Sequence, residues 1–313
     1  MIKKNLSILA IVCSVILSLT GCNLNGGERV HADKDTLQVT HKLGTTTVNF
    51  IPKKVVALDV GALETLYELG IKPAAICKKN LPKYLKILEK NNSIQDAGSI
   101  KEPDLEAIAA VAPDLILISA RQERFYEELK AIAPTIYVGI DPKDYLASFI
   151  KNSKLIGQIF DKEDLVNTKL DSIQHKIAAE QKRFAADPNK ALFLLFNNGK
   201  FSAYGKGSRF GFIHDVLHIK PVLDLEGESV HGQRISNELI AESNPDYLFI
   251  VDRNAAVMGK PANKDDVENT LVKQTKAYKN GKIFYMNPEV WYISGGGLLS
   301  FSKMLEDINT QVN

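Results

Sequence analysis

Five side chains in this sequence have the chemistry to hold an anionic ligand together with a metal ion. Arg121, Arg209 and Arg253 carry guanidinium groups, which suit planar anionic oxygen ligands such as catecholates. His231 and Tyr292 offer an imidazole and a phenolate, which are suitable ligands for ferric iron. Each of the five, taken alone, is more often structural than functional. The interpretation therefore depends on whether the fold brings them to one place.

Two of these arginines end the two copies of an internal repeat. Segments 104–121 and 236–253 align without a gap, and seven of eighteen positions are identical, where unrelated segments would share roughly one. Each copy predicts a short capped helix, a proline that stops it and an apolar strand. Ligands of open α/β sheets bind outside the carboxyl ends of the strands, so the repeat predicts two lobes that direct their arginines into one crevice. The identical pairs are Glu106/Glu238, Ile108/Ile240, Ala109/Ala241, Pro113/Pro245, Asp114/Asp246, Ile118/Ile250 and Arg121/Arg253.

His231 and Tyr292 lie in predicted loops that could reach the same crevice. His231 belongs to segment 229–234, directly upstream of the second copy of the repeat. Tyr292 follows Trp291 and precedes the glycine run 295–297, which would let backbone approach closely. We therefore expect the histidine and the tyrosine to meet the arginines at one site.

Motifs of well-known enzymes are not found, and we predict that the chain is not an enzyme. The sequence contains neither a Gly-x-Ser-x-Gly elbow nor a His-Glu-x-x-His motif, and segment 205–211 does not satisfy the phosphate-loop pattern. His214 and His218 have a metal-capable spacing, but no carboxylate motif accompanies them. Two alternatives stay open. One is a binding protein of the same architecture for haem, cobalamin or a metal ion, and the other is an extracytoplasmic α/β enzyme that uses Cys77 and His214.

The N-terminus has the pattern of an export signal. Two lysines precede an uncharged run from Leu6 to Leu19, which is short for a membrane-spanning helix of about 20 apolar residues. Cys22 directly follows a pair of small residues, an arrangement that resembles the lipobox of bacterial lipoproteins. We predict a signal peptide at residues 1–21, a lipid-modified Cys22 and a flexible tether over residues 22–35. The protein is then expected in the cell envelope, lipid-anchored to the membrane on its periplasmic side or extracellular face.

Alternating strand and helix patterns predict an α/β fold for the rest of the chain. We expect an N-terminal α/β lobe at residues 36–160, a C-terminal α/β lobe at residues 187–313 and one long interlobe helix at residues 161–186. An apolar stripe from Leu165 to Phe184 supports that helix, and its segment from Lys162 to Phe184 alone would be about 34 Å long. The predicted fold class is thus two Rossmann-like lobes joined by a single rigid helix, which would limit lobe movement to a small flex.

Charge and local patterns give further expectations. The formal net charge is +2, and the two lysines of the signal supply that excess, so nothing suggests nucleic acid as the main partner. We also expect a strand at residues 135–140, a helix at residues 267–278 and a loop over residues 289–297.

Taken together, these segments resemble a known family, the siderophore-binding lipoproteins of ABC importers, also called class III or cluster A-II binding proteins. The similarity covers essentially all of the mature chain and is greatest to the branch that binds ferric catecholates of the enterobactin-breakdown and petrobactin kind. The segments that carry it are 81–85, 118–122, 202–205, 208–211, 213–216, His231-Gly232, 244–247, 251–253, Trp291-Tyr292 and 294–297.

The resemblance implies a function and a role for each candidate residue. It implies that Arg121, Arg209 and Arg253 hold the anionic catecholate oxygens. It implies that His231 and Tyr292 complete the coordination of Fe(III) when the siderophore supplies four oxygens. Fe(III) then arrives as part of the siderophore complex, and no intrinsic cofactor is expected.

The resemblance also implies partners. Glu106 and Glu238, one in each lobe, would dock onto the two subunits of an ABC permease that works with its ATPase, and the repeat supports this pairing because a pseudo-twofold surface suits a dimeric receptor. Arg234 departs from the family pattern, in which a smaller or uncharged residue is commoner.

Overall fold

The computed structural model describes residues 35–225 and 231–312. Residues from Asp35 onwards form one compact unit. The predicted signal peptide, Cys22 and nearly all of the predicted tether lie outside the described residues. Within those residues, no helix is long and apolar enough to cross a membrane.

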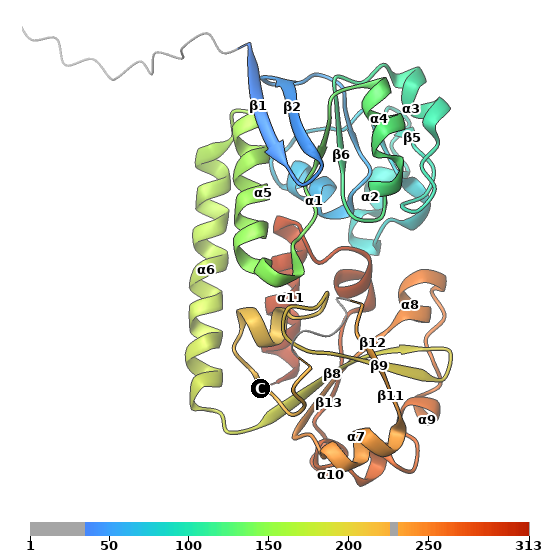
Figure 1. Cartoon of the computed structure of the whole chain (residues 1–313), viewed down its shortest axis with the longest axis vertical. Helices are drawn as coiled ribbons and strands as arrows, with labels where there is room; N and C mark the ends of the chain where they lie inside the picture. Colours follow the sequence, from blue (N-terminus) through green and yellow to red (C-terminus); the bar gives the residue numbers. More distant parts are fainter. Residues whose placement is uncertain (1–34, 226–230, 313) are drawn as a thin grey trace, which may run out of the picture. The chain divides into compact units, whose positions relative to one another are not determined.

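The first half of the fold is a parallel sheet with helices packed against it (Figure 1). Its five strands lie in the order β5-β4-β3-β6-β7 and every pairing is parallel. Helices lie between these strands in the sequence, because two parallel neighbouring strands must be joined by a crossover connection. The strands are β3 (Val55–Ala57), β4 (Ala75–Ile76), β5 (Gln95–Asp96), β6 (Leu115–Ile118) and β7 (Thr135–Tyr137), and the α-helices are α1 (Val60–Glu68), α2 (Lys86–Glu89), α3 (Leu105–Val111), α4 (Tyr126–Ile132) and α5 (Tyr145–Ile159).

The second half is a mixed sheet of six strands. Its order is β11-β9-β8-β12-β13, and β10 pairs with the start of β8. Strands β8, β12 and β13 are parallel, whereas β9 and β11 are antiparallel additions at one edge. The strands are β8 (Lys190–Asn197), β9 (Lys200–Tyr204), β10 (Lys220–Pro221), β11 (Gln233–Ile235), β12 (Tyr247–Asp252) and β13 (Ile283–Tyr285), and the α-helices are α7 (Asn237–Ser243), α8 (Arg253–Met258), α9 (Lys264–Val267), α10 (Lys276–Lys279) and α11 (Leu298–Gln311).

The two copies of the repeat have the same local structure. Asp104 and Ser236 cap α3 and α7, and both helices end at a residue in the left-handed conformation, Ala112 and Asn244. The Asp114 carboxylate accepts hydrogen bonds from the backbone N–H groups of the two residues before β3, Lys53 and Lys54. The Asp246 carboxylate likewise accepts from the backbone N–H of Lys190 at the start of β8. Each copy therefore delivers a buried strand, β6 or β12, into the middle of its own sheet.

One long helix connects the halves. Helix α6 (Glu163–Ala186) has 24 residues, so it is about 36 Å long. Lys169 on this helix pairs with Glu68 of α1 at 2.5 Å, and Gln181 donates a hydrogen bond to the backbone oxygen of Val216 at 2.7 Å. The helix thus contacts both halves (Figure 1). The predicted fold class, two α/β lobes joined by a single long helix, is confirmed, while the exact lobe boundaries stay a prediction.

A chain of aromatic rings runs from one half into the other. Phe149 of α5 stacks on Phe301 of α11 with 3.8 Å between centroids, and Phe301 contacts Phe212 at 5.1 Å. Phe212 meets Trp291 at 5.5 Å, and Trp291 meets Phe193 of β8 at 5.4 Å. Such pairs each add about 0.5–1.5 kcal/mol beyond the burial of their area. Separating the halves would break this continuous core.

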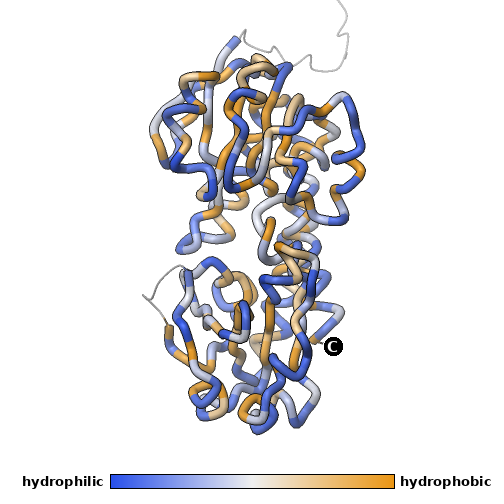
Figure 2. Tube along the Cα trace, turned by 90° about the vertical axis from the view of Figure 1, so that its right-hand side faces the viewer, coloured by the Kyte–Doolittle hydropathy of each residue, from blue (hydrophilic) through white to orange (hydrophobic). Residues whose placement is uncertain are grey.

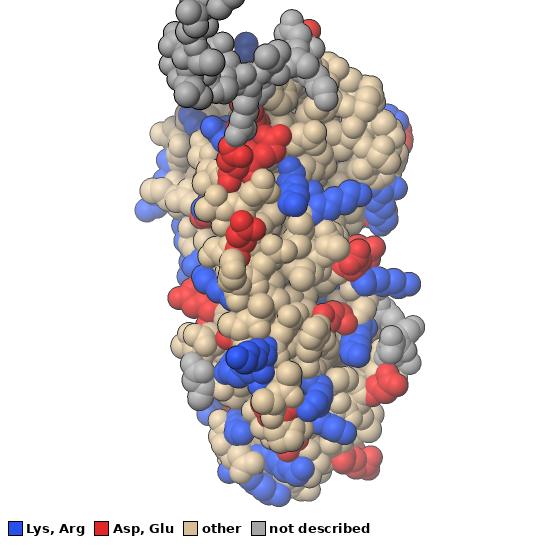
Figure 3. All heavy atoms as spheres, turned by 90° about the vertical axis from the view of Figure 1, so that its left-hand side faces the viewer, with Lys and Arg blue, Asp and Glu red and all other residues tan. Residues whose placement is uncertain are grey.

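Hydropathy along the chain and charge on the surface follow ordinary patterns. Hydrophobic and hydrophilic stretches alternate along the trace in both halves (Figure 2). Figure 3 views the molecule from the left-hand side of Figure 1, where α6 lies. On this face, lysine and arginine are interspersed with aspartate and glutamate. This mixed face agrees with the nearly neutral charge of the chain after its predicted signal peptide.

Three local expectations are wrong. The predicted helix 267–278 is broken into α9, a 3₁₀ turn and α10, because the side chain of Asn269 accepts hydrogen bonds from Leu271 and Val272 and so competes with helical bonding. The predicted loop 289–297 begins as a π-helical turn, η7 (Glu289–Ile293), and the strand expected over 135–140 ends at Tyr137.

The hairpin β1 (Thr36–His41) and β2 (Gly44–Asn49) was not foreseen from the sequence. Its strands are rich in threonine, and most of their residues stay partly or fully exposed. Each strand buries one residue, a valine, which is Val39 in β1 and Val48 in β2. Such a sparse apolar pattern carries little strand signal.

Glu64 of α1 is a fully buried acid between the halves. Its carboxylate accepts hydrogen bonds from the backbone N–H of Ser300 in α11 at 2.9 Å and from the hydroxyl of Tyr84 at 2.5 Å. Burial raises the pKa of Glu64 to about 7, and hydrogen bonds from Ser300, Tyr84 and Ser294 oppose that rise. The folded protein thus holds a proton here at a pH where the unfolded chain has released it.

We expect Glu64→Gln to flatten the pH dependence of stability. Between pH 4.5 and about 7 the folded state binds more protons at Glu64 than the unfolded state, so the free energy of unfolding falls as pH rises through this window. The raised pKa corresponds to a loss of about 3 kcal/mol across it. Chemical denaturation at pH 5 and pH 8 measures the loss in both proteins. The same loss in Glu64→Gln as in the wild type would contradict the assignment.

Candidate ligand-binding site

A cavity of about 580 Å³ opens between the two halves. The first half contributes residues that follow the carboxyl ends of its strands, including Asp59 after β3, Arg121 after β6 and Gly139 after β7. The second half contributes Arg209, His231, Trp291 and the turn 294–296. In the first half the cavity therefore lies outside the carboxyl ends of parallel strands, as the repeat predicts, whereas Arg253 after β12 does not line it.

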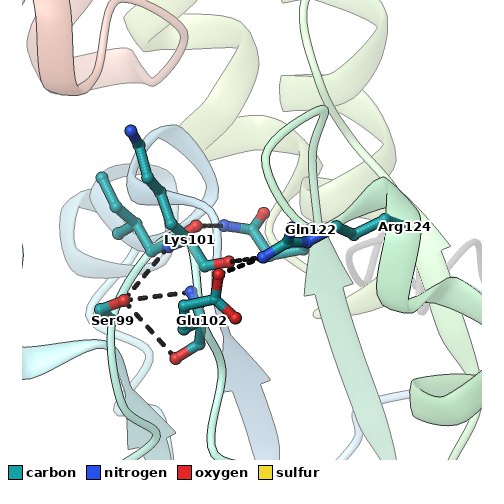
Figure 4. A network of polar contacts seen from close by, with 6 residues as sticks. Ser99, Lys101, Glu102, Gln122 and Arg124 are labelled. Carbon is teal, nitrogen blue, oxygen red and sulfur yellow. Dashed lines mark hydrogen bonds and ion pairs between the residues drawn. The ribbon is translucent and has the colours of Figure 1, made fainter.

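Arg121 is held by a loop that Gln122 closes. The Gln122 side chain is 1% exposed and donates to the backbone oxygens of Ile100 at 2.5 Å and Leu58 at 3.3 Å, while its own oxygen accepts from the N–H of Ser119 at 3.1 Å. Figure 4 shows Gln122 beside a surface network in which Arg124 contacts Glu102. The residue directly after Arg121 thus bonds this loop to the neighbouring segments at Leu58 and Ile100.

The Arg121 guanidinium crosses to the second half. It donates from Nη1 to the backbone oxygen of Ile293 at 2.8 Å and from Nη2 to that of Tyr292 at 2.7 Å. Arg209 donates to the same backbone oxygen of Tyr292, and its guanidinium lies 4.4 Å from the centre of the Tyr292 ring. One peptide carbonyl is therefore shared by two arginines from different halves.

Arg253 contacts the other end of Tyr292. Its Nε donates to the phenol oxygen at 2.9 Å, and its Nη1 donates to the side chain of Asn197 at 3.4 Å. Neither Arg253 nor Tyr292 lines the cavity itself, but the Tyr292 ring contacts Arg209, which does. All three predicted arginines therefore converge on Tyr292.

His231 lines the cavity and is exposed. It precedes β11, an edge strand paired with β9. The following Gly232 has a positive φ of 79°, and a Cβ there would lie 2.6 Å from the Tyr204 ring. Glycine at 232 thus lets the chain pass close to that ring and leaves His231 at the cavity.

The arginines are crowded without carboxylate partners. Within residues 35–225 and 231–312, none of the three guanidinium groups forms an ion pair. Burial, and next the charge of Arg209, lower the pKa of Arg121 to about 10. Buried like charges are costly, and an anionic ligand would relieve that cost.

The same charges act on the phenol. Burial raises the pKa of Tyr292, but the charges of Arg209, Arg253 and Arg121 together with the Arg253 hydrogen bond outweigh it, so that the net pKa lies below the ordinary value of a tyrosine. The phenolate form, which is the one that binds ferric iron, is thereby favoured.

Three cavity residues, Lys42, Glu123 and Tyr137, were missed by the sequence interpretation. Lys42 in the turn of the β1–β2 hairpin pairs with Glu123 at 2.7 Å, and its amine lies 5.2 Å from the centre of the Tyr137 ring. Lys42, Glu123 and Tyr137 all line the cavity. The hairpin itself was not predicted, so no signal in the sequence connected Lys42 to the site.

The residues behind the enzyme alternative are not poised for chemistry. His214 is buried, its Nδ1 lies 2.7 Å from the backbone oxygen of Ile219, and burial lowers its pKa to about 4. Cys77 is buried and free, and burial raises its pKa to about 12, which disfavours the reactive thiolate. In the described part of the chain, no three His, Cys, Asp or Glu side chains are grouped to hold a metal ion.

The remaining predicted residues lie on the surface. Glu106 and Glu238 are exposed in the first turns of α3 and α7. Arg234 is exposed on edge strand β11 and does not line the cavity.

Comparison with known proteins gives a consistent result. A family model described as "Periplasmic binding protein" matches residues 55–290. The chain is 42% identical over 311 residues to the petrobactin-binding protein YclQ of Bacillus subtilis (strain 168), covering 98% of each chain. It is 36% identical over 316 residues to the ferric-anguibactin-binding protein FatB of Vibrio anguillarum (strain ATCC 68554 / 775), again covering 98% of each.

Solved structures agree with these sequence matches. The crystal structure of YclQ superposes with a TM-score of 0.86 at 43% identity and covers 90% of this chain and 99% of that one. The periplasmic catecholate-siderophore binding protein VctP from Vibrio cholerae gives a TM-score of 0.84 at 33% identity and covers 88% and 99%. The likeness extends over both halves of the fold.

Proposed function

This chain belongs to the periplasmic binding protein family, and on that premise we propose that it is the solute-binding component of an ABC importer for iron. It captures a ferric catecholate siderophore in the cavity between the lobes and delivers it to the permease. The observation that carries this proposal is the convergence of Arg121, Arg209 and Arg253 on Tyr292 beside the cavity, without an ion pair to any described carboxylate. The relatives named for petrobactin and ferric anguibactin support the class of ligand.

Capture proceeds by electrostatic attraction and exchange of donors. In the free protein, guanidinium N–H groups donate to the backbone oxygens of Tyr292 and Ile293. When the chelate binds, these hydrogen bonds break and the same N–H groups donate to its anionic oxygens. Fe(III) belongs to this substrate. When the siderophore supplies only four oxygens, His231 and Tyr292 provide the two further ligands, and when it supplies six the two residues remain outside the coordination sphere.

The alternatives receive less support from the described residues. A bare metal ion would need several histidine and carboxylate ligands together, and the described chain groups no three of them. Haem and cobalamin are the alternative ligands for the same architecture, and an intense Soret band in the loaded protein would identify haem.

We also propose that the chain is anchored and docked as its resemblance implies. Cys22 carries the lipid, so Cys22→Ala should move the protein from the membrane fraction to the soluble fraction of the exporting cell. Cell fractionation followed by immunoblotting measures this shift. Continued membrane association of Cys22→Ala would contradict lipid anchoring at this residue.

The exposed acids Glu106 and Glu238 should matter for delivery and not for capture. The double change Glu106→Ala with Glu238→Ala should lower uptake of the labelled ferric siderophore by cells that carry only this protein, while its affinity in solution stays unchanged. Glu242→Ala, an exposed acid on the same α7 as Glu238, is the matched control. Normal uptake by the double variant would remove both residues from the docking surface.

Arg121→Ala should weaken binding of a ferric catecholate by about 1–3 kcal/mol, the range for hydrogen bonds to charged groups. Trp291 is the single tryptophan of the chain and lines the cavity, so quenching of its fluorescence reports occupancy. Arg124→Ala removes an exposed arginine three positions away and should bind like the wild type. Unchanged affinity of Arg121→Ala would exclude Arg121 from the site, and absence of binding by the wild type would reject catecholate capture.

A further inference from the structure

The segment that carries Tyr292 is held in place by the first lobe. Directly after Tyr292, the backbone oxygen of Ile293 accepts from Arg121 at 2.8 Å, and that of Gly295 accepts from the hydroxyl of Tyr145 at 2.7 Å. Both donors come from the first half of the chain. The position of the phenol relative to the cavity therefore depends on how firmly the first lobe holds residues 293–297.

The start of α11 is where this segment is fixed most closely. The helix begins after Gly297, which has no side chain to cap it. Glu64 of α1 supplies the missing oxygen, because its Oε2 accepts from the N–H of Ser300 in the first turn at 2.9 Å. A neighbour of Glu64, Thr65, adds a hydroxyl oxygen that accepts from the N–H of Leu298 at 3.4 Å.

Contacts around the cap leave almost no free space. A Cβ on Gly297 would lie 2.3 Å from the backbone oxygen of Gly61 and 2.5 Å from Oε2 of Glu64. A Cβ on Gly61 would lie 2.8 Å from the backbone of Gly296. Helix α1 and the turn 295–297 therefore pack backbone to backbone, and the turn cannot shift without displacing the Glu64 carboxylate.

We propose that Glu64 is a positioning residue for the ligand site, because by capping α11 it fixes the turn that follows Tyr292 beside the cavity. The inference rests on the proposed function. Residues 294–296, which link Tyr292 to the capped helix, themselves line the cavity. Loss of the cap would loosen residues 293–297 and let the phenol oxygen of Tyr292 shift relative to the cavity.

The role predicts a dependence on how many oxygens the chelate supplies. A ferric complex of a linear bis-catecholate needs the phenol to complete six-coordination, whereas a tris-catecholate complex does not. Glu64 should therefore affect affinity for the first ligand and leave the second nearly unchanged. A general loss of stability would weaken both complexes alike.

The test compares Glu64→Ala, Glu64→Gln and Tyr292→Phe with the wild type, using ferric bis-catecholate and ferric tris-catecholate complexes. Glu64→Ala should lose about tenfold in affinity for the bis-catecholate, the loss expected for one buried hydrogen bond, together with the phenolate-to-iron absorption band. Its affinity for the tris-catecholate should change less than about threefold. Glu64→Gln should bind as the wild type does, because the amide oxygen still accepts from Ser300.

Each result decides between the possibilities. Equal losses for both complexes, or no loss in Glu64→Ala while Tyr292→Phe shows one, would overturn the positioning role. Binding of neither complex by the wild type would reject the proposed function instead. If Glu64→Ala does not fold, Tyr84→Phe removes a single donor to the same carboxylate, and the same ligand-dependent pattern, at smaller size, is then required.

Discussion

Three positive charges held against one tyrosine are the interaction on which the rest of this structure depends. Like charges repel, and here burial strengthens the repulsion between Arg121 and Arg209. The fold restrains them with backbone carbonyls, which accept hydrogen bonds but carry no charge. The free protein thus has a positive potential at this site, which an anionic ligand would balance. The lowered pKa of Tyr292 is an effect of the same positive charges.

The halves are joined more tightly than a two-lobe drawing suggests. Phe149, Phe301, Phe212 and Trp291 form a continuous series of rings across the junction, and the same hydrophobic core contains residues of both sheets. Helix α6 adds contacts to each side. A site built across such a junction is largely preformed, so little binding energy has to be used for ordering it.

Those candidate residues that depend on regular patterns could be placed in the fold from the sequence. Arg121 and Arg253 could be placed because a helix, a proline and an apolar strand recur with each of them, and the structure repeats even the left-handed caps at Ala112 and Asn244. Lys42 and Glu64 could not be placed, because one lies on a threonine-rich hairpin with little strand signal and the other has contacts far away in sequence. The break at Asn269 depends on side-chain bonding that periodicity does not detect.

The last helix has a consequence for how the chain acquires its structure. Helix α11 comes from the end of the sequence, yet its first turn is bonded to Glu64 and Thr65, and its Phe301 stacks on Phe149. The amino-terminal half is therefore incomplete until the final residues arrive. A chain synthesised from its amino end lacks these contacts until α11 has been made, which delays completion of the amino-terminal half.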